Sequence, residues 1–97
     1  MTIARHYKMI AAPEKGEELL AALNALKRAL ADIAGFEGAD LMRDVEDGNR
    51  FTFIERWTSI EAHKQGGKQL PKEALAPVMD ALGATPEGVY LAYIASE

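Results

Sequence analysis

The chain has 97 residues, of which 48% are hydrophobic and 27% are charged, as in globular rather than disordered proteins. This length suits one domain over residues 1–97 and is too short for two. The formal net charge of −4 argues against nucleic-acid binding, and the lack of cysteine excludes disulfides, thiolate metal sites and cysteine nucleophiles.

Metal, membrane and export signals are also missing from the sequence. The two histidines, His6 and His63, are far apart, so we expect no metal site built on imidazole. The first residues lack the charged and apolar regions of a signal peptide, and no run of 18 apolar residues occurs. We therefore expect a cytoplasmic protein that does not bind a membrane.

Residues 2–11 are predicted to form the first strand, with Tyr7 and Met9 on one face and His6 and Lys8 on the other. The proline and acidic residue of segment 13–16 then end the strand and favour the start of a helix.

The helix that follows is the clearest pattern in the chain. Apolar residues recur at spacings of four and three, which predicts one buried stripe of a helix packed on a sheet rather than a coiled coil. Gly35 is a candidate for the residue that ends this helix. The stripe consists of Leu19, Leu23, Leu26, Leu30 and Ile33.

A hairpin is predicted next, from a strand over residues 36–46 with a bulge at Gly38 to a strand over residues 50–57. The Asp-Gly pair in segment 46–49 supplies the turn signal. Alternate residues of the second strand share one face, and these are Phe51, Phe53, Glu55 and Trp57.

The second helical region is predicted to be broken. Thr58 and Glu61 match a capping box, so a short helix should run to about residue 65 and stop at the glycine pair 66–67. A further helix should run from Pro71 to residue 82, and Pro77 should kink it or split it.

The last predicted strand, residues 89–94, is apolar at both parities, which suggests burial on both faces. The predicted order is therefore β-α-β-β-α-β, an α+β fold of the ferredoxin-like kind. It has a four-stranded antiparallel sheet with helices on one face.

The face of this sheet away from the helices predicts a homodimer. It would carry Ile54 and one parity of the last strand, and a second copy packed sheet against sheet would cover that apolar surface. A monomer with a partly polar open face is the alternative, because His6, Lys8 and Arg56 would lie there too.

Segment 53–63 carries a resemblance to a known family. Glu55, Trp57 and Ser59, followed by Glu61, Ala62 and His63, resemble the strand-to-helix signature of the antibiotic biosynthesis monooxygenase (ABM) family. The segments 13–16 and 35–38 are similar to the family's first helix entry and second-strand opening, so the resemblance covers nearly the whole chain.

The resemblance implies a dimeric α/β barrel with a pocket between the sheet and the helices of each subunit. Some members of the family oxidise phenolic, quinol-like or polyketide aromatics with oxygen, without metal or flavin. The resemblance thus implies a cofactor-independent monooxygenase whose partners are a second copy and a small aromatic molecule. A related branch that degrades haem uses an asparagine in the first strand, and residues 2–11 contain none, which disfavours haem.

Two residues are candidates for catalysis. His63 has the side chain whose ordinary pKa suits a general base for a phenol at neutral pH, although a helix-surface histidine is the alternative. The indole of Trp57 could donate to a phenolate or peroxy intermediate, or simply pack as a hydrophobic staple. An aromatic-oxidising branch has asparagine and tyrosine where this chain has Phe53 and His63, which disfavours its polyketide substrates.

Further residues are candidates for binding the substrate. Glu55 should point toward the helices and needs a partner there, either as a structural acceptor or as a proton-transfer group with a raised pKa. Tyr7, Phe53 and Met79 could line the same cavity, with hydrophobic core as the alternative role. A non-catalytic domain that binds a hydrophobic ligand, and a purely structural dimerisation module without a cavity beside Trp57, remain as other functions.

Overall fold

The computed structural model describes residues 1–96 and contains four strands and three helices. The order β-α-β-β-α-α-β confirms the predicted ferredoxin-like arrangement, with the second helical region divided in two. The elements are β1 (Ile3–Ile10), α1 (Gly16–Leu30), β2 (Phe36–Arg43), β3 (Arg50–Trp57), α2 (Ile60–Gln69), α3 (Lys72–Ala81) and β4 (Glu87–Ala92).

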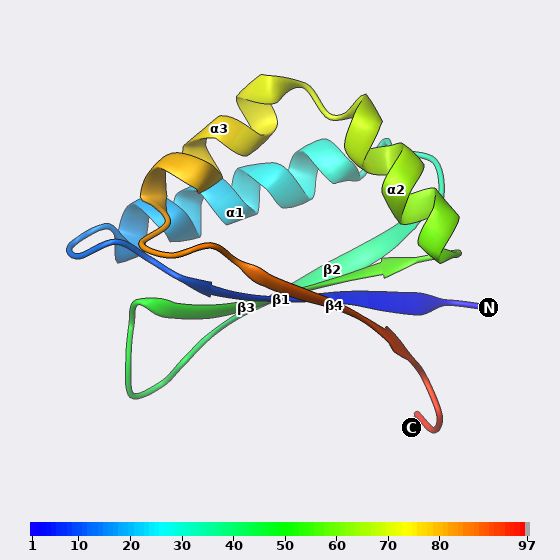
Figure 1. Ribbon diagram of the computed structural model, residues 1–97, viewed down its shortest axis with the longest axis horizontal. Helices are drawn as coiled ribbons and strands as arrows, with labels where there is room; N and C mark the ends of the chain where they lie inside the picture. The colour runs from blue at the N-terminus through cyan, green and yellow to red at the C-terminus, as the bar shows by residue number, and fades with distance from the viewer. Residues whose placement is uncertain (97) are drawn as a thin grey trace.

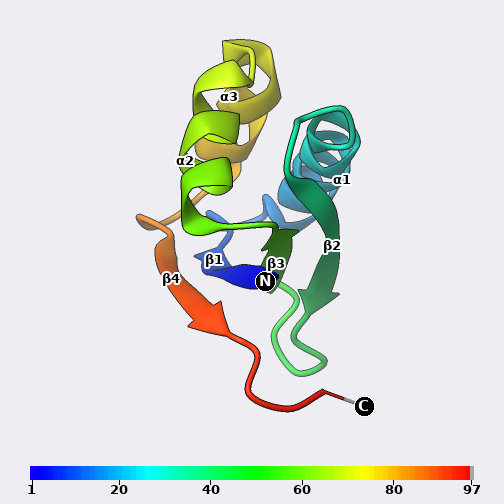
Figure 2. The same cartoon turned by 90° about the vertical axis from the view of Figure 1, so that its right-hand side faces the viewer.

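The four strands form one antiparallel sheet in the order β2-β3-β1-β4. All three helices lie on the same side of this sheet (Figure 1). Viewed along the strands, α1 lies above the β2 side and α3 above the β4 side (Figure 2). The predicted four-stranded sheet with helices on one face is therefore confirmed, and β2 and β4 are its open edges.

The apolar stripe of α1 forms the centre of the core, as predicted. Leu19, Leu23, Leu26 and Leu30 are buried, and they meet the helix-facing side chains Phe51, Phe53 and Trp57 of β3. Helix α1 ends at Leu30, so Gly35 does not terminate it as predicted. Gly35 has φ +88° in the turn into β2, a backbone conformation that favours glycine.

The β2–β3 hairpin and its bulge are confirmed. The register shifts between Phe36 and Gly38, and Gly38 has φ +132°. Strand β2 ends at Arg43 rather than at residue 46, because the Asp44 carboxylate accepts hydrogen bonds from two backbone N–H groups of the turn and curls the chain away.

The predicted start and end of α2 are wrong. Ser59 is the N-cap, since its hydroxyl accepts a hydrogen bond from the N–H of Ala62, whereas the N–H of Thr58 donates to the carbonyl of Gly35. The helix also continues through the glycine pair to Gln69. Gly66 is buried inside the fold, so tertiary packing overrides the low helix propensity of glycine.

Helix α3 runs unbroken through Pro77, which corrects the expected split. The ring of Pro77 is exposed, while Val78 and Ala81 are buried in the core that α3 shares with α1. This packing offsets the backbone hydrogen bond that proline removes.

The predicted burial of the last strand on both faces is wrong within the chain. Strand β4 is an edge strand, and Val89 and Leu91 remain 49% and 48% exposed. They belong to the sheet face that points away from the helices, which we call the outer face. Its partly exposed apolar side chains are Ile10, Met42, Ile54, Val89 and Leu91.

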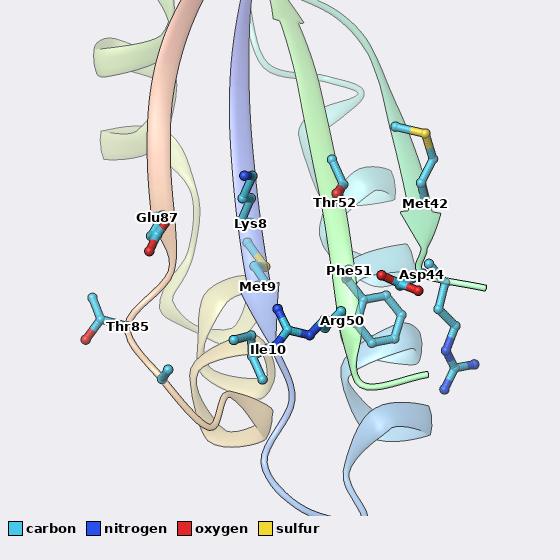
Figure 3. A pocket seen from close by; sticks show the side chains of 12 residues that line it. Lys8, Met9, Ile10, Met42, Asp44, Arg50, Phe51, Thr52, Thr85 and Glu87 are labelled. Atoms are coloured by element: carbon cyan, nitrogen blue, oxygen red, sulfur yellow. The ribbon is translucent and has the colours of Figure 1, made fainter. Parts of the chain in front are cut away.

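An open hollow of about 540 Å³ lies at the hairpin end of the sheet. Figure 3 shows its lining, which includes the charged side chains of Lys8, Asp44, Arg50 and Glu87 and the apolar side chains of Ile10 and Met42. None of the side chains predicted to carry the function lies in it, and the candidate site is instead on the helix side of the sheet.

Candidate functional site

A cavity of about 290 Å³ lies between the sheet and the helices. Polar groups gather at one end of its wall, where Tyr7, Glu55, Trp57 and His63 contribute. The rest of the lining is Gly67 and a set of apolar side chains, namely Met9, Leu26, Leu30, Leu70, Leu75, Val78, Met79, Leu82 and Pro86. The cavity is therefore an apolar space with one polar end.

The structure brings most of the predicted site residues to this one cavity. Tyr7 on β1, Glu55 and Trp57 on β3, His63 on α2 and Met79 on α3 all line it. Phe53 is fully buried in the core and lies outside the lining. A purely structural dimerisation module would have no cavity beside Trp57. The cavity of about 290 Å³ found there argues against that alternative.

The ring of His63 is held between two tyrosine hydroxyls. Its Nε2 lies 2.9 Å from the hydroxyl of Tyr7, and its Nδ1 lies 2.7 Å from the hydroxyl of Tyr90. Burial lowers the pKa of His63, and the nearby charges of Arg5 and Lys64 lower it further. The imidazole is therefore neutral at pH 7, with one nitrogen donating a hydrogen bond and the other accepting one.

Glu55 and Trp57 form the other polar pair of the site. The indole Nε1–H of Trp57 donates to the Glu55 carboxylate at 2.9 Å, and Glu55 is only 4% exposed. Burial raises the pKa of Glu55 from its ordinary 4.5 to about 7, against the opposing effects of the Trp57 hydrogen bond and the Arg5 charge.

Glu55 and His63 are close without forming an ion pair. The distance from Glu55 Oε1 to His63 Nε2 is 3.8 Å, which is too long for a hydrogen bond. A salt bridge would raise the pKa of His63, yet that pKa is lowered, so the imidazole carries no positive charge to pair with at neutral pH. Glu55 therefore makes no direct bond to His63, and its charge acts instead on Tyr7, whose pKa it raises.

Two residues of the site, Arg5 and Tyr90, were not predicted. The Arg5 guanidinium lies 4.3 Å from the ring centre of Tyr90 and 5.0 Å from that of Tyr7, as in cation–π contacts. Gly88 makes room for it, because a β-carbon there would lie 2.6 Å from Arg5 Nη2. The buried Arg5 Nε has no hydrogen-bond partner within residues 1–96.

The sequence held a signal for one of these two residues. Arg5 has the strand parity of Tyr7, so alternation along the strand could have placed it on the same face. The parity of Tyr90 was ambiguous because its strand is apolar at every position, and only the pairing of Arg5 with Tyr90 fixes the face.

Tyr7 is a weaker acid than an ordinary tyrosine. Burial, and then the charge of Glu55, raise its pKa above 10.0, with Arg5 opposing them. Tyr7 is therefore a protonated hydroxyl on the cavity wall, next to a neutral imidazole.

Neither a metal cluster nor a membrane-spanning helix is found in the part of the chain that the structure describes. Within residues 1–96 no three side chains of His, Asp or Glu gather so that they could hold a metal ion. No helix in this range has the length and apolar character needed to cross a bilayer.

Comparison with known proteins places these features in context. A sequence model of the family described as "Antibiotic biosynthesis monooxygenase" matches residues 2–65. None of the curated protein sequences matches the chain.

Several solved structures share the fold over almost the whole chain. A candidate antibiotic biosynthesis monooxygenase from Bordetella bronchiseptica has a TM-score of 0.87 at 17% identity, covering 97% of this chain and 98% of its own. SnoaB, a cofactor-independent oxygenase from Streptomyces nogalater, has a TM-score of 0.85 at 14% identity, covering 98% and 95%. Rv0793 from Mycobacterium tuberculosis has a TM-score of 0.82 at 21% identity, covering 99% and 98%.

Proposed function

The chain belongs to the antibiotic biosynthesis monooxygenase family, and on that premise we propose that it is a cofactor-independent monooxygenase of a small electron-rich aromatic. The cofactor-independent oxygenase SnoaB, which shares the fold, supports this proposal. The observation that carries it is a neutral imidazole, His63, bonded to a tyrosine hydroxyl on the wall of an apolar cavity.

The electrons in the proposed reaction come from the substrate. A phenol or hydroquinone loses a proton, and its anion passes one electron to O₂, which gives a substrate radical and superoxide. The two combine through a new C–O bond to form a peroxide, which takes up a proton. The same carbon then loses its hydrogen as a proton while the O–O bond breaks, leaving a carbonyl group and one water molecule.

The protein has three tasks in this sequence of steps. Its Tyr7 and His63 accept the first proton, and the indole and carboxyl groups of Trp57 and Glu55 face the reacting oxygens at the polar end of the cavity. The apolar walls, Met79 among them, hold the ring and keep water away from the radical pair.

The size of the cavity favours small substrates. Its volume of about 290 Å³ corresponds to roughly ten water molecules. One or two fused rings with a single polar end fit such a space, whereas larger polyketides would need it to widen. We therefore propose a monocyclic or bicyclic hydroquinone as the substrate class.

The outer face supports a homodimer as the working unit. Val89 and Leu91 on β4 and Met42 on β2 are each about half exposed there, and they form part of an apolar surface on the outer face of the sheet. A second copy packed on this surface would bury them in a symmetric contact. Analytical ultracentrifugation tests the dimer, and a Leu91→Lys variant that stays dimeric would contradict this surface.

Oxygen uptake tests the function. The wild-type chain should consume O₂ with a hydroquinone of one or two rings, and His63→Ala should lower kcat by roughly 100-fold or more with the fold intact. His6→Ala is the matched control, because the side chain of His6 lies on the face of β1 opposite to that of Tyr7 and lines no part of the cavity. A chain that binds hydroquinones without consuming oxygen is the ligand-binding alternative, and that result would reject the enzyme.

A further inference from the structure

We infer that Tyr7, His63 and Tyr90 form a proton wire, which leads from the cavity to the edge strand β4 and has Tyr90 as its outer end. The inference rests on the proposed function, since it assigns a path to the proton that the substrate loses. It adds to the site one residue that does not touch the cavity.

The two ends of the wire differ in position. Tyr7 lines the cavity, whereas Tyr90 is absent from its lining and lies on the edge strand, partly exposed. His63 joins them with short contacts of 2.9 Å and 2.7 Å at its two ring nitrogens. Because both nitrogens are already occupied, a substrate proton reaches the imidazole through the hydroxyl of Tyr7.

A neutral imidazole between two hydroxyls has two arrangements. In the first, Tyr7 donates to Nε2 and the protonated Nδ1 donates to Tyr90; in the second, Tyr90 donates to Nδ1 and the protonated Nε2 donates to Tyr7. Passing one proton from the cavity outward converts the first arrangement into the second. Tyr7 takes the substrate proton and gives its own to Nε2, Nδ1 gives its proton to Tyr90, and Tyr90 releases its own to water.

The proposed chemistry restores the wire without a ring flip. The peroxide formed later needs one proton before water can leave, and a proton that enters at Tyr90 and travels inward returns the imidazole to its first arrangement. One proton leaves and one returns in each turnover, so the wire ends as it began.

The cation beneath the wire favours this exchange over a charged intermediate. Arg5 lies under the rings of both tyrosines, and its charge contributes to the lowered pKa of His63. The doubly protonated, positively charged form of the His63 ring is therefore disfavoured. Each proton that arrives at one nitrogen should leave from the other.

The tautomer of His63 tests the wire without any substrate. With only two histidines in the chain, ¹⁵N-histidine labelling gives two rings, and His6→Gln assigns them. A phenol donates to imidazole more strongly than it accepts, so Tyr90→Phe should place the ring proton on Nδ1 and Tyr7→Phe should place it on Nε2. The same tautomer in both variants would overturn the inference.

Turnover then tests whether the wire carries protons. With a hydroquinone, Tyr90→Phe should lower kcat roughly 10- to 100-fold at nearly unchanged KM. In mixtures of H₂O and D₂O, the plot of kcat against the deuterium fraction should be curved for the wild type, because several protons move together, and linear for the variant. Tyr93→Phe is the control, since Tyr93 lies beyond β4 and makes no contact with His63. An unchanged kcat in Tyr90→Phe would reject the relay. A wild-type chain that consumes no oxygen would reject the proposed function alone, because the tautomers decide the wire separately.

Discussion

Gly66 lies with its α-carbon directly against the indole ring of Trp57. A β-carbon on Gly66 would be 2.5 Å from Cη2 and 2.7 Å from Cζ3 of that ring, closer than atoms can approach. Trp57 is 1% exposed and its Nε1–H is bonded to Glu55, so the ring has no room to move away. The close approach of α2 to β3 therefore depends on glycine at this position.

The neighbouring glycines should respond to alanine in opposite directions. Gly66→Ala should lower the free energy of unfolding by about 1–2 kcal/mol, because overpacking against Trp57 exceeds the gain in helix propensity. Gly67→Ala should raise it by up to about 1 kcal/mol, because a β-carbon there meets nothing within 4 Å. Urea denaturation measures both free energies of unfolding. Equal changes in the two variants would contradict the close packing of Gly66 on Trp57.

The buried carboxyl group of Glu55 should make the protein less stable as the pH rises. Its pKa is about 7 in the folded chain and 4.5 ordinarily, so between these values the folded state holds a proton that the unfolded state has lost. The free energy of unfolding should fall across pH 4.5–7, by on the order of 3 kcal/mol, and stay level above. Glu55→Gln should remove this fall in urea titrations from pH 4 to 8.5.

His63 should contribute the opposite slope at lower pH. Its pKa is lowered in the folded chain, so the unfolded state binds more protons below the ordinary value of 6.5 and stability rises with pH there. Comparing wild type with Glu55→Gln isolates the carboxyl contribution, and His63→Gln isolates that of the imidazole. A Glu55→Gln curve parallel to wild type would contradict the raised pKa.

Removing the indole donor should raise the pKa of Glu55 above about 7. The hydrogen bond from Trp57 stabilises the carboxylate, and Trp57→Phe deletes it while leaving an aromatic ring in place. Carboxyl ¹³C chemical shifts measure the pKa directly. The same variant should lose about 1–3 kcal/mol of unfolding free energy. An unchanged pKa would show that the indole does not hold the carboxylate.

Oxygen uptake should increase as Glu55 ionises. The charge of Glu55 raises the pKa of Tyr7, which makes the Tyr7 oxygen a better acceptor for the substrate proton. With a hydroquinone that the wild type oxidises, kcat/KM should rise through a pKa of about 7, the value for Glu55. Glu55→Gln should abolish that rise. If kcat/KM of the variant still rises with pH through the same range, the rise belongs to another titrating group.

Alternation along β1 and β3 was enough to predict much of the site. Parity placed Tyr7 with Met9 on one face of β1, and it placed Glu55 with Trp57 on one face of β3; the structure has Tyr7, Glu55 and Trp57 on the cavity wall. The stripe of α1 was equally clear because its leucines repeat at helical spacing. Where one face of a helix or strand is mostly apolar and the other polar, the sequence pattern predicts which face is buried.

The errors came where a distant contact decides the local structure. The glycine pair at 66–67 signalled a helix end, yet Gly66 stays in the helix because it packs against Trp57 of β3, a contact that helical periodicity does not reveal. The strand of Tyr90 is apolar on both sides, so its face depends on pairing with β1. The His63 contact with Tyr90 was therefore invisible in the sequence.

Gly67 lies where the cavity opens to the surface. Gly67 lines the cavity, is exposed, and has free space where a side chain would begin. Gly67→Leu should place an apolar side chain in this opening and weaken hydroquinone binding roughly tenfold or more. The variant should also be about 1 kcal/mol more stable, because leucine is a far better helix former than glycine.

This combination of higher stability with weaker binding separates a blocked cavity from a damaged fold. Trp57 is the only tryptophan of the chain and lies on the cavity wall, so quenching of its fluorescence reports ligand binding directly. Lys68→Leu is the matched control, since it adds leucine one position further along α2, outside the lining. If Gly67→Leu binds hydroquinone as tightly as Lys68→Leu does, the ligand does not occupy this cavity, and the site proposed on its polar end loses its basis.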